Sequence, residues 1–371
     1  MEEPMMDAAK GEIKRLHRRR MLYIAVATIA LVLLMSWSVT ISSTTITPVQ
    51  VYEVLINAIF PGTFDVPYRT THIVLNTYLP RVLIAMVAGA LLAIGGSVTQ
   101  TIMRNSLATP YTLGVSSSAA FGASLSILFG ITAVAGRYGT ILNAFAFSLI
   151  PAMMILLASS RRNMSPASMV LIGVAISYVF SACTTLSQYF GDAEATKTAM
   201  FWTVGDLNSV LLEFVPYVAV TLVATFFISM YLTKNMDALR MGDDTATSLG
   251  VNVHTTRVVL MVLACFSTAV VVSFVGAIGF ICLLAPHISR LIGGGSIRFL
   301  IPASAVTGAL LLTIADIIAK DLINPIMLPV GAITAVIGGP VLVYLLFKSR
   351  SSSFRFAGFR PWPHLCCPGS S

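Results

Sequence analysis

The sequence predicts an all-α, polytopic membrane protein with ten transmembrane helices and both termini in the cytoplasm. The first observation behind this prediction is composition. Of the 371 residues, 56% are hydrophobic and only 10% are charged, and the mean hydropathy is +0.87. A water-soluble domain carries roughly 25% charged residues. The composition therefore indicates an integral membrane protein and disfavours a cytosolic enzyme, a nucleic-acid-binding protein and a secreted disulfide-rich domain.

The second observation is a series of ten apolar stretches, each close to the twenty or so residues that a helix needs to cross a bilayer. In chain order they are Met21 to Ile41, Leu79 to Met103, Thr112 to Ile131, Gly139 to Ser159, Ala167 to Tyr189, Leu211 to Leu232, Val258 to Phe274, Gly276 to Ile292, Phe299 to Ala319, and Ile326 to Phe347. Because ten is even, both termini are expected on one side. We interpret the first stretch as a retained span, not as a cleaved signal peptide.

The third observation is the placement of the basic residues, which tests this topology independently. Segments that the topology places inside hold 18 of the 23 Lys and Arg residues, including six within the first twenty residues. Cytoplasmic segments of membrane proteins are enriched in such residues. The outer segments hold only Arg69, Arg81, Arg137, Lys197 and Lys320. The net charge of +8 is thus explained by membrane topology, without a nucleic-acid partner.

The chain therefore divides into a basic cytoplasmic segment (1–20), a ten-helix transmembrane domain (21–348) and a cytoplasmic tail (349–371) that we expect to be disordered. Three connections are long enough to fold. Thr47-Pro48 is a helix-start signal, which predicts a short helix over Val49 to Phe60. A second helix is expected at the outer interface around Ala199 to Gly205. The third connection, Lys234 to Arg257, is predicted to be a compact cytoplasmic loop.

Small residues recur every four positions in the third apolar stretch, at Gly114, Ser118, Gly122 and Ser126. Such stripes let helix backbones approach closely. We favour close helix packing for this stripe over a role in lining a pore.

Asp316 lies within the ninth predicted span, and an acidic residue in that position is a functional candidate. A structural role, with Lys320 four residues later as its partner, is favoured over ion coupling. The sequence contains no phosphate-binding loop, no zinc-binding spacing among its five cysteines and no nucleophile motif. We therefore expect no catalysis, no metal site and no cofactor on this chain.

Several ordered blocks of residues, distributed from the second stretch onward, resemble one known family. The blocks are Leu79-Pro80-Arg81, Ala88-Gly89-Ala90, Gly95-Gly96, Arg104 to Ala108 with Pro110, Leu113 to Ser117, Leu249-Gly250-Val251, Phe274 to Phe280, Ala285 to Arg290, Ala315-Asp316, Leu328 to Gly331, and Gly338-Gly339-Pro340. Together they resemble the FecCD family, the permease subunits of ATP-driven importers for iron chelates, haem and cobalamin.

The resemblance implies a cell-membrane permease that forms a translocation pathway with a second permease subunit, identical or related. Two ATPase subunits, which bind ATP and Mg²⁺, would dock on the inside, and a substrate-binding protein would deliver the substrate outside. In such permeases the fifth and tenth helices border the pathway. A ferric siderophore is the first choice of substrate, and cobalamin and haem remain open.

The resemblance also implies roles for matching residues. Arg81 and Lys320 match outward basic positions that bind acidic residues of the binding protein, and Ser165 and Pro166 match a cytoplasmic gate. Ala238 to Gly250 matches the loop that inserts into the ATPase. Its expected coupling residues are Ala238, Leu239, Gly242, Asp243, Leu249 and Gly250.

Two other classes of protein remain alternatives. A secondary transporter driven by an ion gradient would share the hydropathy but requires buried ionisable residues, of which only Asp316 qualifies. A membrane enzyme is the weaker alternative, because no cluster of acids, histidines or cysteines has catalytic spacing.

Overall fold

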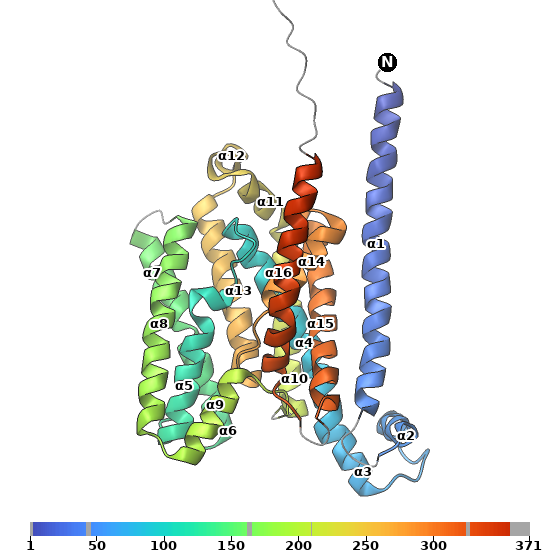
Figure 1. Cartoon of the computed structure of the whole chain (residues 1–371), viewed down its shortest axis with the longest axis vertical. Coiled ribbons are helices and arrows are strands. Elements are labelled where there is room, and N and C mark those ends of the chain that lie inside the picture. The colour runs from blue at the N-terminus through green and yellow to red at the C-terminus, as the bar shows by residue number, and fades with distance from the viewer. Residues whose placement is uncertain (1–2, 42–45, 162–164, 209, 324–326, 357–371) are drawn as a thin grey trace, which may run out of the picture.

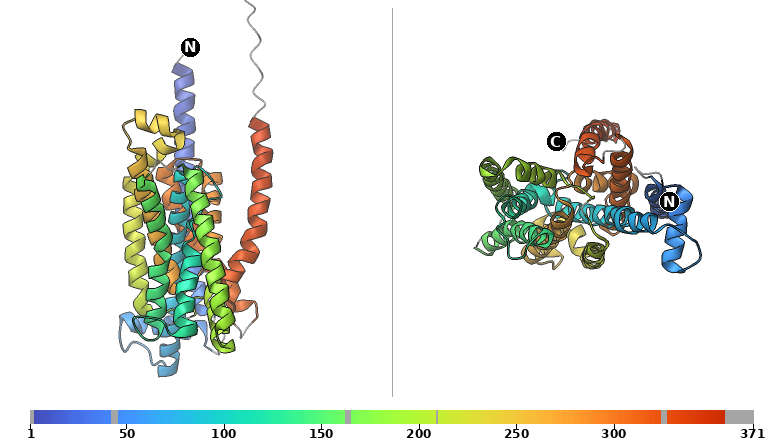
Figure 2. Two further views of the ribbon diagram at one scale, coloured as in Figure 1. Left: turned by 90° about the vertical axis from the view of Figure 1, so that its left-hand side faces the viewer. Right: turned by 90° about the horizontal axis from the view of Figure 1, so that it is seen from below.

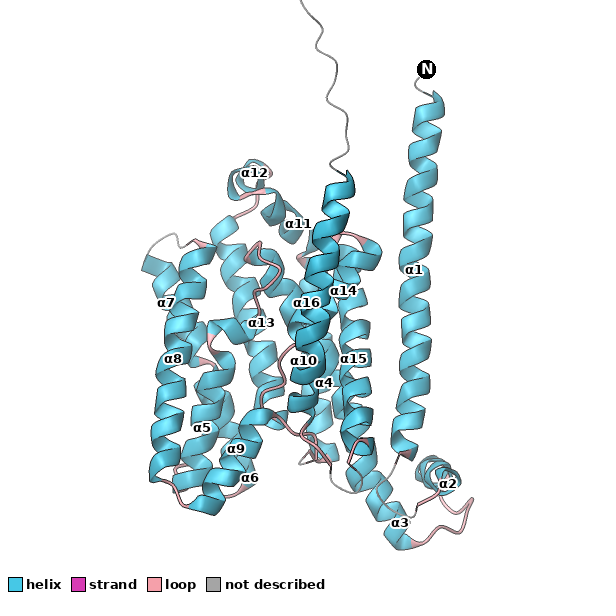
Figure 3. Ribbon diagram, in the orientation of Figure 1, coloured by secondary structure: helices cyan, strands magenta, loops and turns pink. Residues whose placement is uncertain are grey.

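The computed structural model describes residues 3–41, 46–161, 165–208, 210–323 and 327–356, and within these ranges it is helical with no strand (Figure 3). The α-helices are α1 (Glu3–Thr40), α2 (Pro48–Ile59), α3 (Tyr68–Ile73), α4 (Leu79–Ile102), α5 (Val115–Phe129), α6 (Arg137–Ser148), α7 (Ile150–Arg161), α8 (Pro166–Phe190), α9 (Ala193–Val204), α10 (Val215–Tyr231), α11 (Thr233–Met241), α12 (Asp243–Ser248), α13 (Val253–Val275), α14 (Ile281–Gly293), α15 (Ile297–Asp321) and α16 (Val330–Phe356). Short turns of other helix types are η1 (Val74–Tyr78, π), η2 (Pro110–Leu113, 3₁₀) and η3 (Leu212–Phe214, 3₁₀).

Helices long and apolar enough to cross a membrane number seven in the described part of the chain. They cover Lys14–Thr40, Tyr68–Ile102, Arg137–Ala158, Pro166–Phe190, Leu212–Tyr231, Val253–Val275 and Ile297–Asp321. Three shorter apolar helices cover Val115–Phe129, Ile281–Gly293 and Val330–Leu345. Each of the ten predicted stretches overlaps one of these helices, so the all-helical membrane fold is confirmed, while three of the helices are shorter than expected.

Backbone conformation explains two of the shorter helices. Gly114, just before α5, has a φ of +93°, and Gly276, just after α13, has a φ of +70°. A left-handed residue ends the regular hydrogen-bond pattern of a helix, and glycine adopts that conformation without a steric penalty. Phe280 also has a positive φ, of 58°. The chain from Gly276 to Phe280 is therefore an irregular connection, although it lies within a predicted span.

Helix α4 forms the centre of the bundle and is buried along almost its whole length. It packs against α15, α13, α10 and α14. Gly89 of α4 faces Gly308 of α15 so closely that a Cβ atom on either residue would overlap the backbone of the other. A Cβ atom on Gly96 would likewise overlap the backbone of Cys282 in α14. These glycines let α4 lie directly against two neighbours, as small residues do in membrane bundles.

Several helices at the rim expose most of their apolar surface. Helix α1 stands at the edge of the bundle, and α16 tilts away from the bundle towards its C-terminal end (Figure 2). Large exposed side chains on α8 and α16 are Leu171, Tyr178, Val179, Leu186, Tyr189, Phe190, Val336, Ile337, Val343, Tyr344 and Phe347. Exposed apolar surface of this extent belongs against lipid or against another protein subunit.

The connections folded as predicted in two places. Helix α2 begins at Pro48 with a reciprocal cap, in which the Thr47 hydroxyl accepts from the Gln50 amide and the Gln50 side chain accepts from the Thr47 amide. Helix α9 contains the predicted interfacial segment and ends at Val204. Helix α16 continues to Phe356, past residue 349 where the tail was expected to begin. Residues 357–371, with Cys366 and Cys367, lie outside the described residues.

The two ends of the bundle differ. The start of α1, the α11–α12 pair and the C-terminal end of α16 lie at one end, which we call the α12 end (Figure 1). Helices α2 and α3 lie at the opposite end, which we call the α2 end (Figure 1).

Candidate functional site

The connection between α10 and α13 folds into two short helices, α11 and α12, as the compact loop predicted from the sequence. Gly242 joins the two helices with a φ of +124°, and Gly250 follows α12 with a φ of +81°. Asp243 and Asp244 occupy the first turn of α12, where negative charge is favourable near the free amide groups. The two glycines therefore define the turns, and the acids define the start of the second helix.

One side of this loop packs on the bundle, and the other side is open. Met236, Leu239 and Ala246 are almost completely inaccessible to solvent, and Ala238 is buried with them. Leu249 is 64% exposed, although it is a large apolar residue. The loop is thus a firmly packed projection that presents an apolar side chain at its free surface.

Asp243 joins the loop to two helices of the bundle. One of its oxygens, Oδ1, lies 2.8 Å from a guanidinium nitrogen of Arg104, just after α4, and 2.8 Å from one of Arg257, in α13. Arg257 is 5% exposed, whereas Arg104 is 38% exposed. Arg104 also has a φ of 49°, which is unusual for a residue other than glycine. These two contacts were not predicted from the sequence.

The loop also contacts the connection between α14 and α15. The Arg240 guanidinium donates to the Gly295 carbonyl oxygen. Asp237 accepts from the Ile297 amide at 3.4 Å, and lies 4.0 Å from Arg240. Through these contacts, movement of the loop would displace the end of α4, helix α13 and the start of α15.

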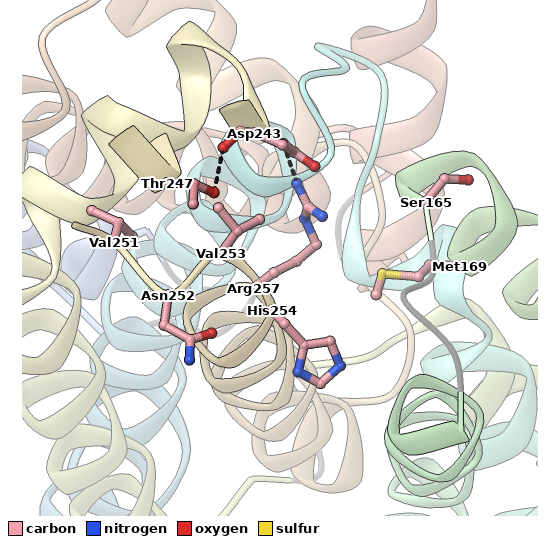
Figure 4. A pocket seen from close by; sticks show the side chains of 9 residues that line it. All are labelled: Ser165, Met169, Asp243, Thr247, Val251, Asn252, Val253, His254 and Arg257. Atoms are coloured by element: carbon pink, nitrogen blue, oxygen red, sulfur yellow. Dashed lines mark hydrogen bonds and ion pairs between the residues drawn. The ribbon is translucent and has the colours of Figure 1, made fainter. Parts of the chain in front are cut away.

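A cavity of about 580 Å³ lies between the loop and the first turn of α8 (Figure 4). Its lining residues are Ser165, Met169, Asp243, Thr247, Val251, Asn252, Val253, His254 and Arg257. Ser165 caps α8 by accepting from the Ser168 amide at 3.2 Å, and Pro166 is the first helical residue. The structure thus places the predicted gate residue Ser165 across a cavity from the predicted coupling residue Asp243.

A second group of charges lies inside the bundle towards the α2 end. Asp316 of α15 lies 2.5 Å from Arg81 of α4 and 2.6 Å from Lys320, one turn further along α15. Their exposed fractions are 0% for Asp316, 1% for Arg81 and 3% for Lys320. The Ser38 hydroxyl of α1 lies 3.1 Å from the Lys320 ammonium. This cluster therefore joins α1, α4 and α15.

Arg81 and Lys320, the predicted docking residues, are both buried against Asp316 in this chain. A π-helical turn, η1, precedes α4, and the Leu79 amide bonds to the Val74 carbonyl five residues back. Such a turn inserts an extra residue and changes which side of the following helix faces inward. The interpretation of Asp316 as a structural partner of Lys320 agrees with the observed contact.

The small-residue stripe of α5 faces neighbouring helices. A Cβ atom on Gly122 would meet the Asn143 carbonyl and Phe147 of α6, and one on Gly114 would meet α8. The Ser126 hydroxyl lies 2.9 Å from the Thr140 hydroxyl of α6, while Ser118 donates to the Gly114 carbonyl at 2.8 Å. In this chain alone, the stripe lies at helix contacts.

Sequence reasoning also missed a polar pair inside the bundle at the α12 end. Arg290 of α14 donates to the Gln100 side chain of α4 at 2.5 Å. Gln100 lies among mostly small residues in a predicted span, and it belongs to no recognisable local motif. Over the described ranges, no group of three or more His, Cys, Asp or Glu residues is placed to hold a metal ion.

The fold and these contacts define a multi-pass, all-helical membrane protein with a packed two-helix projection at one end. Residues 29–348 match the FecCD transport family. The chain is 42% identical to a protein of Methanocaldococcus jannaschii described as an ABC transporter permease, over 74% of this chain and 82% of the relative. It is 33% identical to the Fe(3+)-citrate import system permease protein YfmE of Bacillus subtilis, over 91% of this chain and 98% of the relative.

A solved structure described as an inward-facing conformation of a metal-chelate type ABC transporter is also similar. Its TM-score is 0.76 at 28% sequence identity, and the match covers 88% of this chain and 98% of that one. The chain belongs to the FecCD transport family. It is a multi-pass membrane permease of that family.

Proposed function

We propose that this chain is one of two permease subunits in an ABC importer of an iron-siderophore-type chelate, with ATP bound and hydrolysed on partner subunits. The observation that carries the proposal is the packed α11–α12 loop, with Asp243 tied to α4 and α13. A separate motor subunit can drive a membrane pathway only through a projection that moves as a unit with the spans. The burial of Met236 and Leu239 makes this loop such a projection.

The topology of the proposal is ten spans with both termini in the cytoplasm. It is supported by the seven long and three shorter apolar helices of the described ranges. It is also supported by the position of the start of α1, the α11–α12 loop and the end of α16 at one end of the bundle (Figure 1). The basic residues of 1–20 and of the tail would then lie on the cytoplasmic side.

The partners are inferred from the family and from the exposed surfaces. In this proposal the pathway lies beside the fifth and tenth predicted helices, which correspond to α8 and α16. Their exposed apolar side chains, such as Tyr178 and Tyr344, fit a second permease subunit, identical or related, or lipid. The ATPase subunits, with ATP and Mg²⁺, would bind the α11–α12 loop, for which the open side with Leu249 and Gly250 is the natural contact.

The binding protein would dock at the α2 end. The proposed docking residues Arg81 and Lys320 are engaged by Asp316 in this structure. For direct contact with acidic residues of a partner, Arg81 or Lys320 would therefore have to separate from the Asp316 carboxylate.

The gate proposal places Ser165 and Pro166 at the cytoplasmic mouth of the pathway. Both begin α8, and the cavity separates Ser165 from the loop. Movement of the loop into that cavity would press on the first turn of α8.

The substrate is proposed by analogy with the iron-citrate relative, and cobalamin and haem remain alternatives for the same machinery. An ion-driven transporter is less well supported. Asp316 already has two cationic partners, so its charge is balanced within the protein and is not free to bind a transported ion.

The test is reconstitution of this chain with its cognate ATPase and binding protein in proteoliposomes. Radiolabelled ferric siderophore, haem and cobalamin are offered with and without ATP on the ATPase side. The proposal predicts uptake of the ferric siderophore only with ATP. Uptake of one of the other two would change the substrate, and uptake that follows an imposed ion gradient without ATP would overturn the proposal.

A further inference from the structure

The inference concerns the three charged groups that join the α11–α12 loop to the bundle, and it rests on the proposed function. Asp243 Oδ1 is shared by Arg104 and Arg257 at equal distances of 2.8 Å. We propose that Asp243 and Arg257 form the pair through which loop movement reaches α13, and that Arg104 is a second, releasable partner of the same carboxylate. We call these three residues the loop latch.

The two arginines differ in their surroundings, and this difference assigns their roles. Arg257 is 5% exposed, so its pair with Asp243 is shielded from water on the arginine side. Arg104 is 38% exposed, so solvent and salt weaken its pair. Removing Asp243 would leave a buried arginine without its counter-charge, which is far more unfavourable than losing an exposed pair.

Among the residues that the structure describes, Arg257 has no second ion-pair partner that could replace Asp243. In the part of the chain that the structure describes, the polar contact of Arg257 is the one to Asp243, and its Nε is buried without a hydrogen-bond partner. The Asp243 backbone carbonyl accepts from the Thr247 hydroxyl at 2.8 Å, which stiffens the first turn of α12 (Figure 4). The Asp243 carboxylate is therefore attached to a rigid turn. Such rigidity is needed if movement of α12 is to be transmitted through this side chain.

The position of Arg104 explains why it can be released. It follows the C-terminal end of α4, and its backbone φ of 49° is held there against its usual preference. Gly242, at the hinge between α11 and α12, has open space around it apart from Arg104 and Thr245. Rotation at Gly242 would separate Asp243 from Arg104 before it disturbs the pair that Asp243 forms with the buried Arg257 side chain.

The cavity beside α12 provides the space that this movement requires. Asp243, Thr247 and Arg257 line one part of its wall, and Ser165 and Met169 of α8 line another. With the latch closed, the space of about 580 Å³ separates α12 from the start of α8. Release of Arg104 would let α12 shift across this space while α13 moves with it through Arg257. The latch thus joins ATPase-driven movement of the loop to the gate.

The experiment measures substrate imported per ATP hydrolysed, in proteoliposomes of the full importer, together with the thermal midpoint of the purified permease. Asp243→Asn is expected to lower the import-to-ATP ratio about fivefold, a size that single residues reach in coupling two sites. Asp244→Asn is the matched control, because it removes the same charge from the same turn, where the described structure gives that side chain no ion pair. It is expected to change the ratio less than about twofold.

Two further variants separate coupling from folding. Arg104→Gln is expected to lower the ratio less than Asp243→Asn does, with an unchanged thermal midpoint. The exchange variant Asp243→Arg with Arg257→Asp restores an opposite-charge pair and is expected to recover at least half of the ratio lost in Asp243→Asn.

The latch is overturned if Asp243→Asn imports as much per ATP as the parent protein, or if Asp244→Asn has an equal effect. It is also overturned if the exchange variant folds and assembles but recovers nothing. If Asp243→Asn does not fold, Arg257→Lys, which keeps the charge but shortens the reach, replaces it, and a normal ratio in that variant rejects the latch. Failure of the proposed function is seen separately, because the parent importer would then show no ATP-dependent uptake.

Discussion

Arg81 of α4 and Asp316 of α15 form a fully buried ion pair, with 2.5 Å between the guanidinium Nε and the carboxylate Oδ1. The same carboxylate binds Lys320 at 2.6 Å. Two cations therefore share one anion in the interior, and the cluster joins the central helix to its main neighbour. Breaking a buried pair by removing one partner is strongly destabilising, since the other charge is left uncompensated.

This arrangement predicts that Asp316→Asn lowers the stability of the permease by about 3–5 kcal/mol, because Arg81 and Lys320 lose their counter-charge. The measurement is thermal or denaturant unfolding in detergent, followed by helical circular dichroism. The matched control is Asp321→Asn on the exposed end of the same helix, where the described structure shows no ion pair. An unchanged unfolding midpoint in Asp316→Asn would contradict a structural role for this acid.

The same variant also tests the alternative mechanism. If enough Asp316→Asn folds to be reconstituted, its uptake is expected to keep its ATP dependence. Loss of a dependence on an ion gradient in this variant would instead favour a secondary transporter.

Gly89 provides a prediction about helix packing. Gly89→Ala is expected to destabilise the permease by about 1–3 kcal/mol, because the added methyl group would overlap the Gly308 backbone and push α4 from α15. Gly11→Ala in α1, where nothing lies within 4 Å of an added Cβ, is the control and is expected to be neutral or slightly stabilising. Equal unfolding midpoints for the two variants would show that α4 and α15 are less closely packed than described.

Gly250 tests the shape of the α11–α12 loop. Its φ of +81° disfavours other residues, although an added Cβ would meet no atom within 4 Å. Gly250→Val is expected to destabilise this turn by about 1–2 kcal/mol and to lower import per ATP hydrolysed without preventing membrane insertion. Gly250→Asn is the control, since asparagine tolerates a left-handed backbone, and it should retain most of the coupling. Normal coupled uptake by Gly250→Val would contradict the assignment of this loop as the part that couples ATP hydrolysis to import.

Ser165 tests the start of α8. Ser165→Ala removes the cap on the Ser168 amide and is expected to destabilise the first turn by about 1 kcal/mol. Hydrogen exchange of the Ser168 amide should become faster. Ser165→Asp, which keeps a capping oxygen, should exchange like the parent. If the Ser168 amide exchanges at the same rate in both variants, the Ser165 hydroxyl does not stabilise this turn.

Local signals in the sequence were sufficient for several elements. Thr47 and Pro48 identified the start of α2, because a cap and a first-turn proline act within four residues. The helix-forming and turn residues between Lys234 and Arg257 likewise identified a folded loop, and the structure divides it at Gly242 into α11 and α12. These features depend on neighbours along the chain, so a sequence shows them directly.

Other features could not be read in this way. The span prediction extended the eighth helix to Gly276, whereas α14 begins at Ile281, since hydropathy reports solvent preference and not backbone conformation. The burial of Arg81 depends on its partner Asp316, which lies 235 residues away in the sequence. Arg104 and Asp243 are separated by 139 residues, so no local pattern associates them.

Hydropathy and charge were enough to predict an all-helical membrane protein with most of its basic residues on one predicted side, because both act through the solvent around each segment. Its ordered motifs also identified the family. The pairing of charges became visible only in the packed fold: Asp316 pairs with Arg81 and Lys320, and Asp243 pairs with Arg104 and Arg257. A charge excluded from water is stabilised by whichever opposite charge the packed helices bring within a few ångströms, and that choice depends on helix contacts far apart in the chain.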